Sequence, residues 1–103
     1  MEIFKNAKNY SVYLEEDGDD FWITVTNGHC RIFACYVGQI EPSNDVVCCL
    51  ETAAATFYPK IYIDECSDHV GVTAAQMVQF TKDAYEIENV LEEALITYKE
   101  GRL

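Results

Sequence analysis

The sequence predicts an α+β fold in which an antiparallel meander of three to four strands is covered on one face by a long C-terminal helix. Two observations carry this prediction. Residues 10–37 form three β-like runs separated by Asp-Gly and Asn-Gly, dipeptides typical of hairpin turns. Residues 73–100 instead repeat apolar side chains at helical spacing. The chain has 103 residues and shows no linker, so one domain over 1–103 is expected.

Three strands are predicted in the first third of the chain. Residues 10–15 and 21–26 each alternate apolar and polar positions, as half-buried strands do. The acidic run 16–20 lies between them as a hairpin turn, because glycine accepts the positive φ of such turns. A third strand is predicted over 29–37. Residues 1–9 fit either a helical turn or an edge segment.

The middle of the chain is ambiguous. Residues 38–44 contain proline and asparagine and are predicted to form a loop. Residues 46–58 fit a helix with Ser43 or Asn44 as its cap, or a strand, since their β-branched start favours the strand. Three consecutive alanines favour the helix, which we adopt.

Beyond this segment the signals are clearer. Pro59 is predicted to end the first helix, and residues 60–64 resemble a short fourth strand. Thr73 and Gln76 have the spacing of a capping box, which opens a second helix. This helix is predicted to run to about residue 100, with Gly101 as its C-terminal stop.

The long helix has a distinct apolar stripe, which we expect to cover the sheet: Met77, Phe80, Ala84, Ile87, Leu91, Ala94, Leu95 and Tyr98. Three carboxylates are predicted to point to solvent: Asp83, Glu86 and Glu93. A smaller apolar strip lies beside the stripe: Val78, Tyr85 and Ile96. It either packs against the first helix or a loop, or forms a dimer or partner contact.

The charge balance limits the classes of partner. Eighteen acidic residues against seven basic ones give a net charge of −11. Such a surface repels nucleic acid and anionic membranes and attracts basic protein surfaces. The N-terminus lacks the apolar run of a signal peptide, and no stretch is apolar enough to span a membrane. Five cysteines without the even spacing of a disulfide framework favour a cytoplasmic protein with reduced thiols.

No catalytic residue, metal or cofactor is predicted. An EF-hand aligned on Gly18 would place Tyr13 and Thr24 at its first and twelfth positions, where calcium needs carboxylates. Four residues offer zinc-binding atoms but lack paired zinc spacing: His29, Cys30, Cys66 and His69. Cys66 and His69 are the only neighbours that suggest a nucleophile and a base.

Acidity is therefore the feature that points to function. The acids fall in three groups: Glu15, Glu16, Asp17, Asp19 and Asp20 on the first hairpin; Asp64, Glu65 and Asp68 after the last predicted strand; and Asp83, Glu86, Glu88, Glu92, Glu93 and Glu100 along the helix. Rows of carboxylates can occupy a basic nucleic-acid channel by the same electrostatics as DNA. The simpler alternative is that they only keep the protein soluble. Trp22, Tyr13 and the apolar strip are candidate anchors, since aromatic residues carry much interface energy.

In length, acidity and small α+β pattern, the chain resembles phage-encoded inhibitors of host defence, such as anti-CRISPR and DNA-mimic anti-restriction proteins. The resemblance concerns size and charge and involves no family motif. It implies stoichiometric, non-enzymatic inhibition of a CRISPR nuclease or restriction complex through its basic groove. The alternative is a structural or housekeeping domain that dimerises through Val78, Tyr85 and Ile96. An enzyme that uses Cys66 and His69 is the third hypothesis.

Overall fold

The computed structural model describes residues 1–39 and 46–101, which form four strands and three helices. The strands are β1 (Glu2–Lys5), β2 (Ser11–Asp17), β3 (Asp20–Thr26) and β4 (Arg31–Gln39). The helices are α1 (Val46–Thr56), α2 (Pro59–Ser67) and α3 (Ala74–Glu100). The predicted α+β class, with an antiparallel sheet and a long C-terminal helix, is confirmed.

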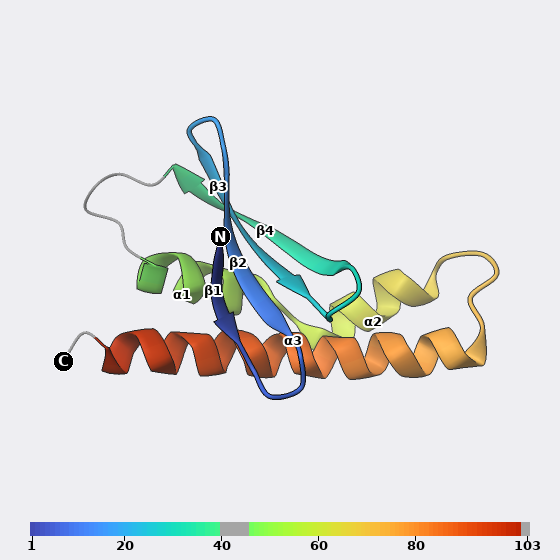
Figure 1. The fold of residues 1–103 in the computed structure, drawn as a ribbon. Coiled ribbons are helices and arrows are strands. Elements are labelled where there is room, and N and C mark those ends of the chain that lie inside the picture. Colours follow the sequence, from blue (N-terminus) through green and yellow to red (C-terminus); the bar gives the residue numbers. More distant parts are fainter. Residues whose placement is uncertain (40–45, 102–103) are drawn as a thin grey trace.

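The four strands form one sheet in the order β1-β2-β3-β4, and each is antiparallel to the next. The N-terminal residues contribute β1, so the edge-segment alternative for 1–9 is the correct one. The helices lie together on one side of the sheet, with α3 extending beneath the strands and α1 and α2 arranged along it (Figure 1). Among the described residues, helices therefore cover one face of the sheet and none covers the other.

The β2–β3 hairpin is tighter than predicted. Asp17 pairs with Asp20, so only Gly18 and Asp19 form the turn. Gly18 has a φ of +63°, the sign that a type II′ turn requires at its first position and that glycine adopts without steric cost. Because the turn needs only two residues, Glu16 and its neighbours belong to the strands instead of a five-residue loop.

The helical interpretation of 46–58 is confirmed by α1, but the predicted strand over 60–64 is wrong. These residues belong to α2, and Pro59 occupies its first turn. Proline is favoured there because its fixed φ suits a helix and its missing N–H would have no helical partner. Tyr62 and Ile63 pack against the core from this helix. A short run of apolar residues fits both the helical and the strand period, so the pattern alone did not distinguish a helix from a strand here.

The predicted loop over 38–44 is wrong for its first two residues, because Gly38 and Gln39 belong to β4. The rest of that loop and both proposed caps, Ser43 and Asn44, lie outside the described residues.

The capping box of α3 is confirmed. The Thr73 hydroxyl oxygen accepts from the Gln76 backbone N–H at 3.1 Å, and the Gln76 side-chain oxygen accepts from the Thr73 N–H at 2.8 Å. The helix ends at Gly101, as predicted. That glycine keeps a right-handed φ of −64° and donates its N–H to the Thr97 carbonyl at 3.0 Å, so the left-handed glycine stop is absent.

The core lies between the sheet and the helices. From the sheet it contains Val12, Ile23 and Val25, and from α1 it contains Leu50 and Ala53. The predicted stripe of α3 is confirmed, with four members fully buried and four partly buried: Ala84, Ile87, Leu91 and Ala94, then Met77, Phe80, Leu95 and Tyr98.

Replacement of a central core residue is expected to destabilise the protein strongly. Ile87→Ala removes buried apolar atoms at a fully buried position and should lower the free energy of unfolding by about 2–5 kcal/mol. Ile96→Ala, on the exposed side of the same helix, should change it by less than about 1 kcal/mol. Urea denaturation followed by circular dichroism measures both, and equal effects would contradict the assignment of the core face.

Candidate functional site

The sheet face without helices collects the acidic and aromatic side chains of the first hairpin. Residues paired directly across an antiparallel ladder share a face, and successive residues alternate between faces. Val12 pairs with Val25 on the covered face, so the intervening positions point the other way. We call this surface the open face; its members are Tyr13, Glu15, Asp17, Asp20, Trp22, Thr24, Arg31, Ala34 and Tyr36.

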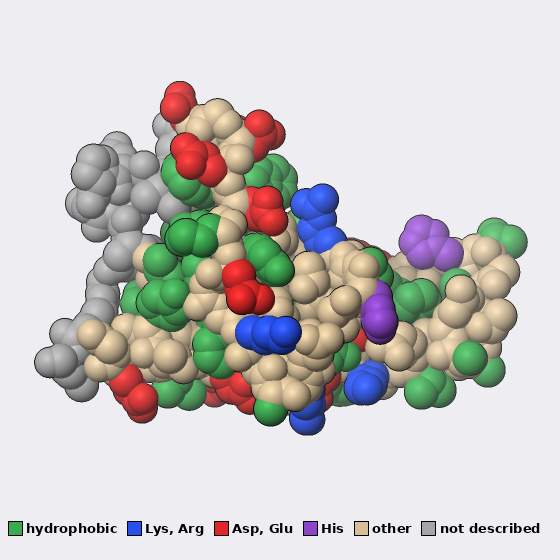
Figure 2. Space-filling view, viewed as in Figure 1, with side chains coloured by type: hydrophobic (Ala, Val, Ile, Leu, Met, Phe, Trp, Pro, Cys, Tyr) green, Lys and Arg blue, Asp and Glu red, His purple; other side chains and the backbone are tan. Residues whose placement is uncertain are grey.

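The register divides the acidic run between the two faces. Glu15, Asp17 and Asp20 belong to the open face, whereas Glu16 pairs with Phe21 on the other side and Asp19 lies in the turn. The tip of the hairpin extends beyond the helices, and carboxylates gather on it (Figure 2). The five acids that were predicted as one group therefore contribute three to a shared face.

Trp22 and Tyr36 form an aromatic pair on the open face. Their ring centroids are 5.3 Å apart at an interplanar angle of 65°, an edge-to-face arrangement. Trp22 is 36% exposed and Tyr36 is 48% exposed. The Tyr36 hydroxyl donates to the Asp20 carboxylate at 3.0 Å, and this hydrogen bond raises the pKa of Tyr36. Tyr36 thus holds the Asp20 carboxylate in place.

Sequence reasoning missed Tyr36 as a site residue. The alternation of side chains along β4 assigns Tyr36 to one of two faces. It does not show which face that is until the pairing of β4 with β3 is known. Tyr36 pairs with Trp22, which in turn pairs with Glu15, so the three side chains form one row across three strands.

A hollow of about 280 Å³ lies on this part of the surface, lined by Glu15, Glu16, Asp17, Trp22, Arg31 and Ala34. The small Ala34 side chain leaves space beside the larger indole. The Thr24 hydroxyl donates to the Glu15 carboxylate at 3.4 Å, a long hydrogen bond that orients this acid. The carboxylates of Glu15 and Asp17, which belong to the open face, thus line the hollow together with a single guanidinium, that of Arg31.

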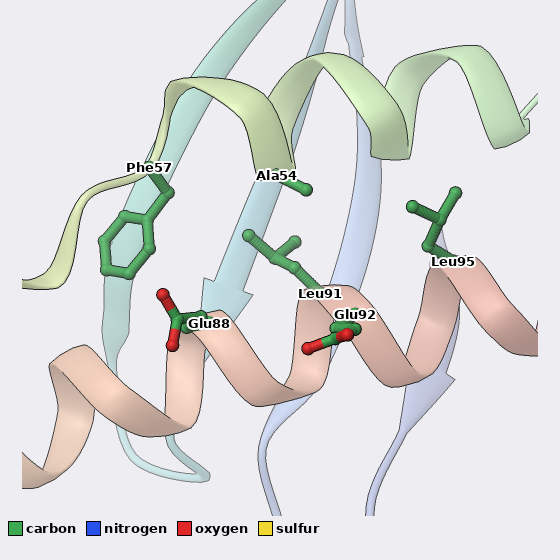
Figure 3. A pocket seen from close by; sticks show the side chains of 6 residues that line it. All are labelled: Ala54, Phe57, Glu88, Leu91, Glu92 and Leu95. Atoms are coloured by element: carbon green, nitrogen blue, oxygen red, sulfur yellow. The ribbon is translucent and has the colours of Figure 1, made fainter.

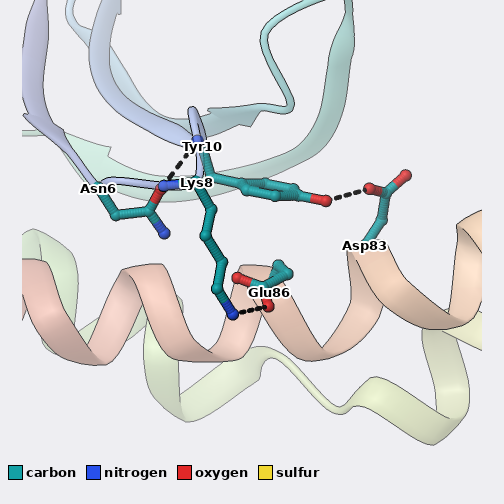
Figure 4. A network of polar contacts seen from close by, with 5 residues as sticks. All are labelled: Asn6, Lys8, Tyr10, Asp83 and Glu86. Atoms are coloured by element: carbon teal, nitrogen blue, oxygen red, sulfur yellow. Dashed lines mark hydrogen bonds and ion pairs between the residues drawn. The ribbon is translucent and has the colours of Figure 1, made fainter.

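Two acids predicted to face solvent are buried instead. Asp83 is 2% exposed and Glu86 is 8% exposed. Asp83 accepts hydrogen bonds at 2.8 Å from the Tyr10 hydroxyl and from the Gln79 side-chain amide. Glu86 forms an ion pair with Lys8 at 2.9 Å (Figure 4). Both carboxylates stabilise the contact between α3 and the connection from β1 to β2, so they are removed from the candidate contact surface.

The remaining acids stay exposed, on other surfaces. Asp64 and Glu65 lie on α2 and Asp68 caps its end, where a strand end had been predicted. Glu93 is exposed on α3 and lines a shallow hollow with Lys5 and Lys8. Neither group belongs to the open face.

The apolar strip of α3 is also exposed. Val78 is 71% exposed, and Tyr85 and Ile96 are each close to half exposed. The alternative that this strip packs within the chain is therefore wrong. Lys82 and Glu92 lie between its members along the sequence, so the strip is a row of separated side chains.

A second hollow of about 310 Å³ lies between α1 and α3 (Figure 3). Ala54 and Phe57 contribute from the α1 side, and Leu91 and Leu95 from α3, together with two carboxylates, Glu88 and Glu92. It is a shallow gap between two packed helices, and no catalytic arrangement lines it.

The thiols and histidines do not assemble into a site. Within the described residues, no group of three or more His, Cys, Asp and Glu side chains could hold a metal ion. His29 and Cys30 lie in the β3–β4 turn, where a strand had been predicted. Burial raises the pKa of the Cys66 thiol, which keeps it protonated and a weak nucleophile at neutral pH.

Comparison of the chain with known protein families, curated proteins and solved structures found no match. Over residues 1–39 and 46–101, no helix combines the length and apolarity needed to cross a membrane.

The buried tyrosines predict a pH-dependent loss of stability. Burial raises the pKa of Tyr10, and that of Tyr62, well above the usual value of about 10. Their contribution is fully present below pH 10 and is lost as the pH rises above it, because unfolding then releases protons. The free energy of unfolding should fall above pH 10. Tyr10→Phe should lower stability at pH 7 by about 1–3 kcal/mol, since Asp83 loses a donor, and should flatten part of the alkaline decline.

Denaturation curves measured from pH 7 to 11 test this prediction. Tyr85→Phe serves as the matched control, because its side chain is half exposed on the outer side of α3. A Tyr10→Phe profile that runs parallel to that of the parent protein would contradict the role assigned to the Tyr10–Asp83 pair.

Proposed function

We propose that this protein is a non-enzymatic inhibitor that binds the basic surface of a nucleic-acid-handling complex, of the CRISPR nuclease or restriction type, through its open face. The observation that carries the proposal is the shared placement of Glu15, Asp17 and Asp20 with Trp22 and Tyr36 on a sheet face that no helix covers. The bound protein would exclude nucleic acid from the channel that it occupies.

The electrostatic part of the proposal follows from charge balance. A net charge of −11 on a chain of 103 residues attracts a basic groove over a distance of about a Debye length, ~8 Å at physiological salt. Same-face residues on a strand are about 7 Å apart, so Glu15 and Asp17 present a row of charges. Such charges mainly accelerate association and orient the two partners.

The aromatic pair supplies apolar contact area, which charges alone do not provide. Tryptophan and tyrosine are enriched among the residues that dominate interface energies, because they bury a large area at a small entropic cost. Trp22 and Tyr36 already contact each other in the free protein. The open face thus combines charges for steering with apolar area for affinity.

Self-association through α3 is the second candidate. Val78, Tyr85 and Ile96 are exposed and lie along one line of the helix. Their separations along the axis are about 10 Å and 16 Å at 1.5 Å per residue, which suits two helices that cross or run side by side. Because Lys82 and Glu92 lie between the apolar side chains of the strip, we rank self-association second.

Neutralisation of the open-face acids is expected to weaken inhibition strongly while the fold persists. A triple variant with Glu15→Gln, Asp17→Asn and Asp20→Asn removes two exposed charges and one half-buried charge. Each contributes up to about 1 kcal/mol. Binding should weaken roughly tenfold to a hundredfold. DNA binding and cleavage by purified CRISPR nucleases and restriction complexes, measured against increasing amounts of inhibitor, would test this expectation. For the true target, inhibition should be stoichiometric, relieved by excess DNA and weakened by salt.

The matched control makes the same change in net charge on α2, with Asp64→Asn, Glu65→Gln and Asp68→Asn. This variant should retain most of the inhibition. If both triple variants lose inhibition equally, overall charge and not the open face is responsible. If no complex in the panel is inhibited, the proposed function is contradicted.

The dimer hypothesis makes a separate prediction. Multi-angle light scattering should give twice the mass of the chain, and Tyr85→Glu should restore the monomer, because a charge replaces an apolar contact in the interface. Tyr58→Glu changes a comparably exposed tyrosine next to α2 and should leave the mass unchanged. A monomeric parent protein at high concentration would exclude this candidate.

A further inference from the structure

We propose that the hollow beside Trp22 accepts an arginine side chain of the partner protein. The inference rests on the proposed function and specifies the chemical group that the open face recognises. Its geometric basis is an indole, the small Ala34 side chain and the carboxylates of Glu15 and Asp17 around one cavity of about 280 Å³.

The surroundings of the hollow favour a cation. Glu15 and Asp17 line it from the open face, and Asp20 pairs with Asp17 at the end of the same ladder. Arg31 also lines the hollow and is the one basic residue among the lining side chains. Carboxylates thus outnumber the resident cation, and an incoming positive charge gains attraction from several acids at once.

The indole favours arginine over lysine. A planar guanidinium stacks on an aromatic face, carries less tightly held water than an ammonium group and can donate to two carboxylates at once. Tyr36 contacts Trp22 edge-to-face, and the Thr24 hydroxyl orients Glu15. Tyr36 therefore supports the indole wall before the partner arrives, and Thr24 adds a long hydrogen bond to the Glu15 acceptor.

Trp22 can report binding in the hollow by its fluorescence, because the chain contains one tryptophan. The protein is titrated with three capped peptides that differ only in side chain, with two arginines, two lysines or two neutral citrullines separated by glycine. The arginine peptide should change the indole fluorescence saturably and bind roughly two- to fivefold more tightly than the lysine peptide, the range of an exposed cation–π contact. The citrulline peptide should not saturate.

Two single substitutions locate the binding site. Glu15→Gln should weaken the arginine peptide roughly two- to fivefold, the range of an exposed ion pair. Asp64→Asn makes the same change in charge on α2 and should leave the affinity unchanged. Equal affinities for the arginine and lysine peptides, or equal effects of the two substitutions, would overturn the proposal.

Two combinations of results distinguish a failure of this inference from a failure of the proposed function. A target complex inhibited by the parent protein and not by the open-face triple variant, together with equal arginine and lysine affinities, would refute the arginine anchor alone. A triple variant that still inhibits would refute the proposed function and, with it, the inference that rests on it.

Discussion

The pairing of Asp17 with Asp20 across a two-residue turn sets the register on which the rest of the sheet depends. That register turns Val12 and Val25 toward the helices, and Glu15 and Trp22 away from them. Because side chains alternate strictly, a slip of one residue would move the apolar set into solvent and the acids into the core. The hydrophobic core and the open face are therefore two consequences of one constraint, and the turn at Gly18 maintains both.

The acidic residues fall into two groups, one buried in the fold and one exposed on the surface. Asp83 and Glu86 are buried, where Tyr10, Gln79 and Lys8 supply donors. Such buried acids are stabilising only while every partner is present, so they serve the fold and cannot serve a partner protein. The acids of the hairpin and of α2 remain in solvent and repel one another. A basic partner would relieve that repulsion, which gives the surface acids a reason to act together.

Local signals in the sequence predicted most of the fold. The Asp-Gly turn, the capping box at Thr73 and the stripe of α3 each depend on residues within a few positions, and each was confirmed. The 60–64 segment failed because its few apolar residues fit either period and Pro59 was interpreted only as a stop. The prediction for Asp83 and Glu86 failed for a different reason: Tyr10 and Lys8, which donate to them, lie more than 70 positions away in the sequence. The pairing of Tyr36 with Trp22 was likewise a matter of tertiary register.

The contacts within the open face distinguish it from a surface that only confers solubility. Solubility requires charge and exposure and is indifferent to how the side chains lie. Here Tyr36 holds Asp20, Thr24 orients Glu15, and Trp22 contacts Tyr36. Each contact restricts rotamers in the free protein, so less conformational entropy remains to be lost when a partner binds. A preorganised row of acid, indole and phenol across three strands is therefore the kind of surface that the proposed recognition of a basic partner requires.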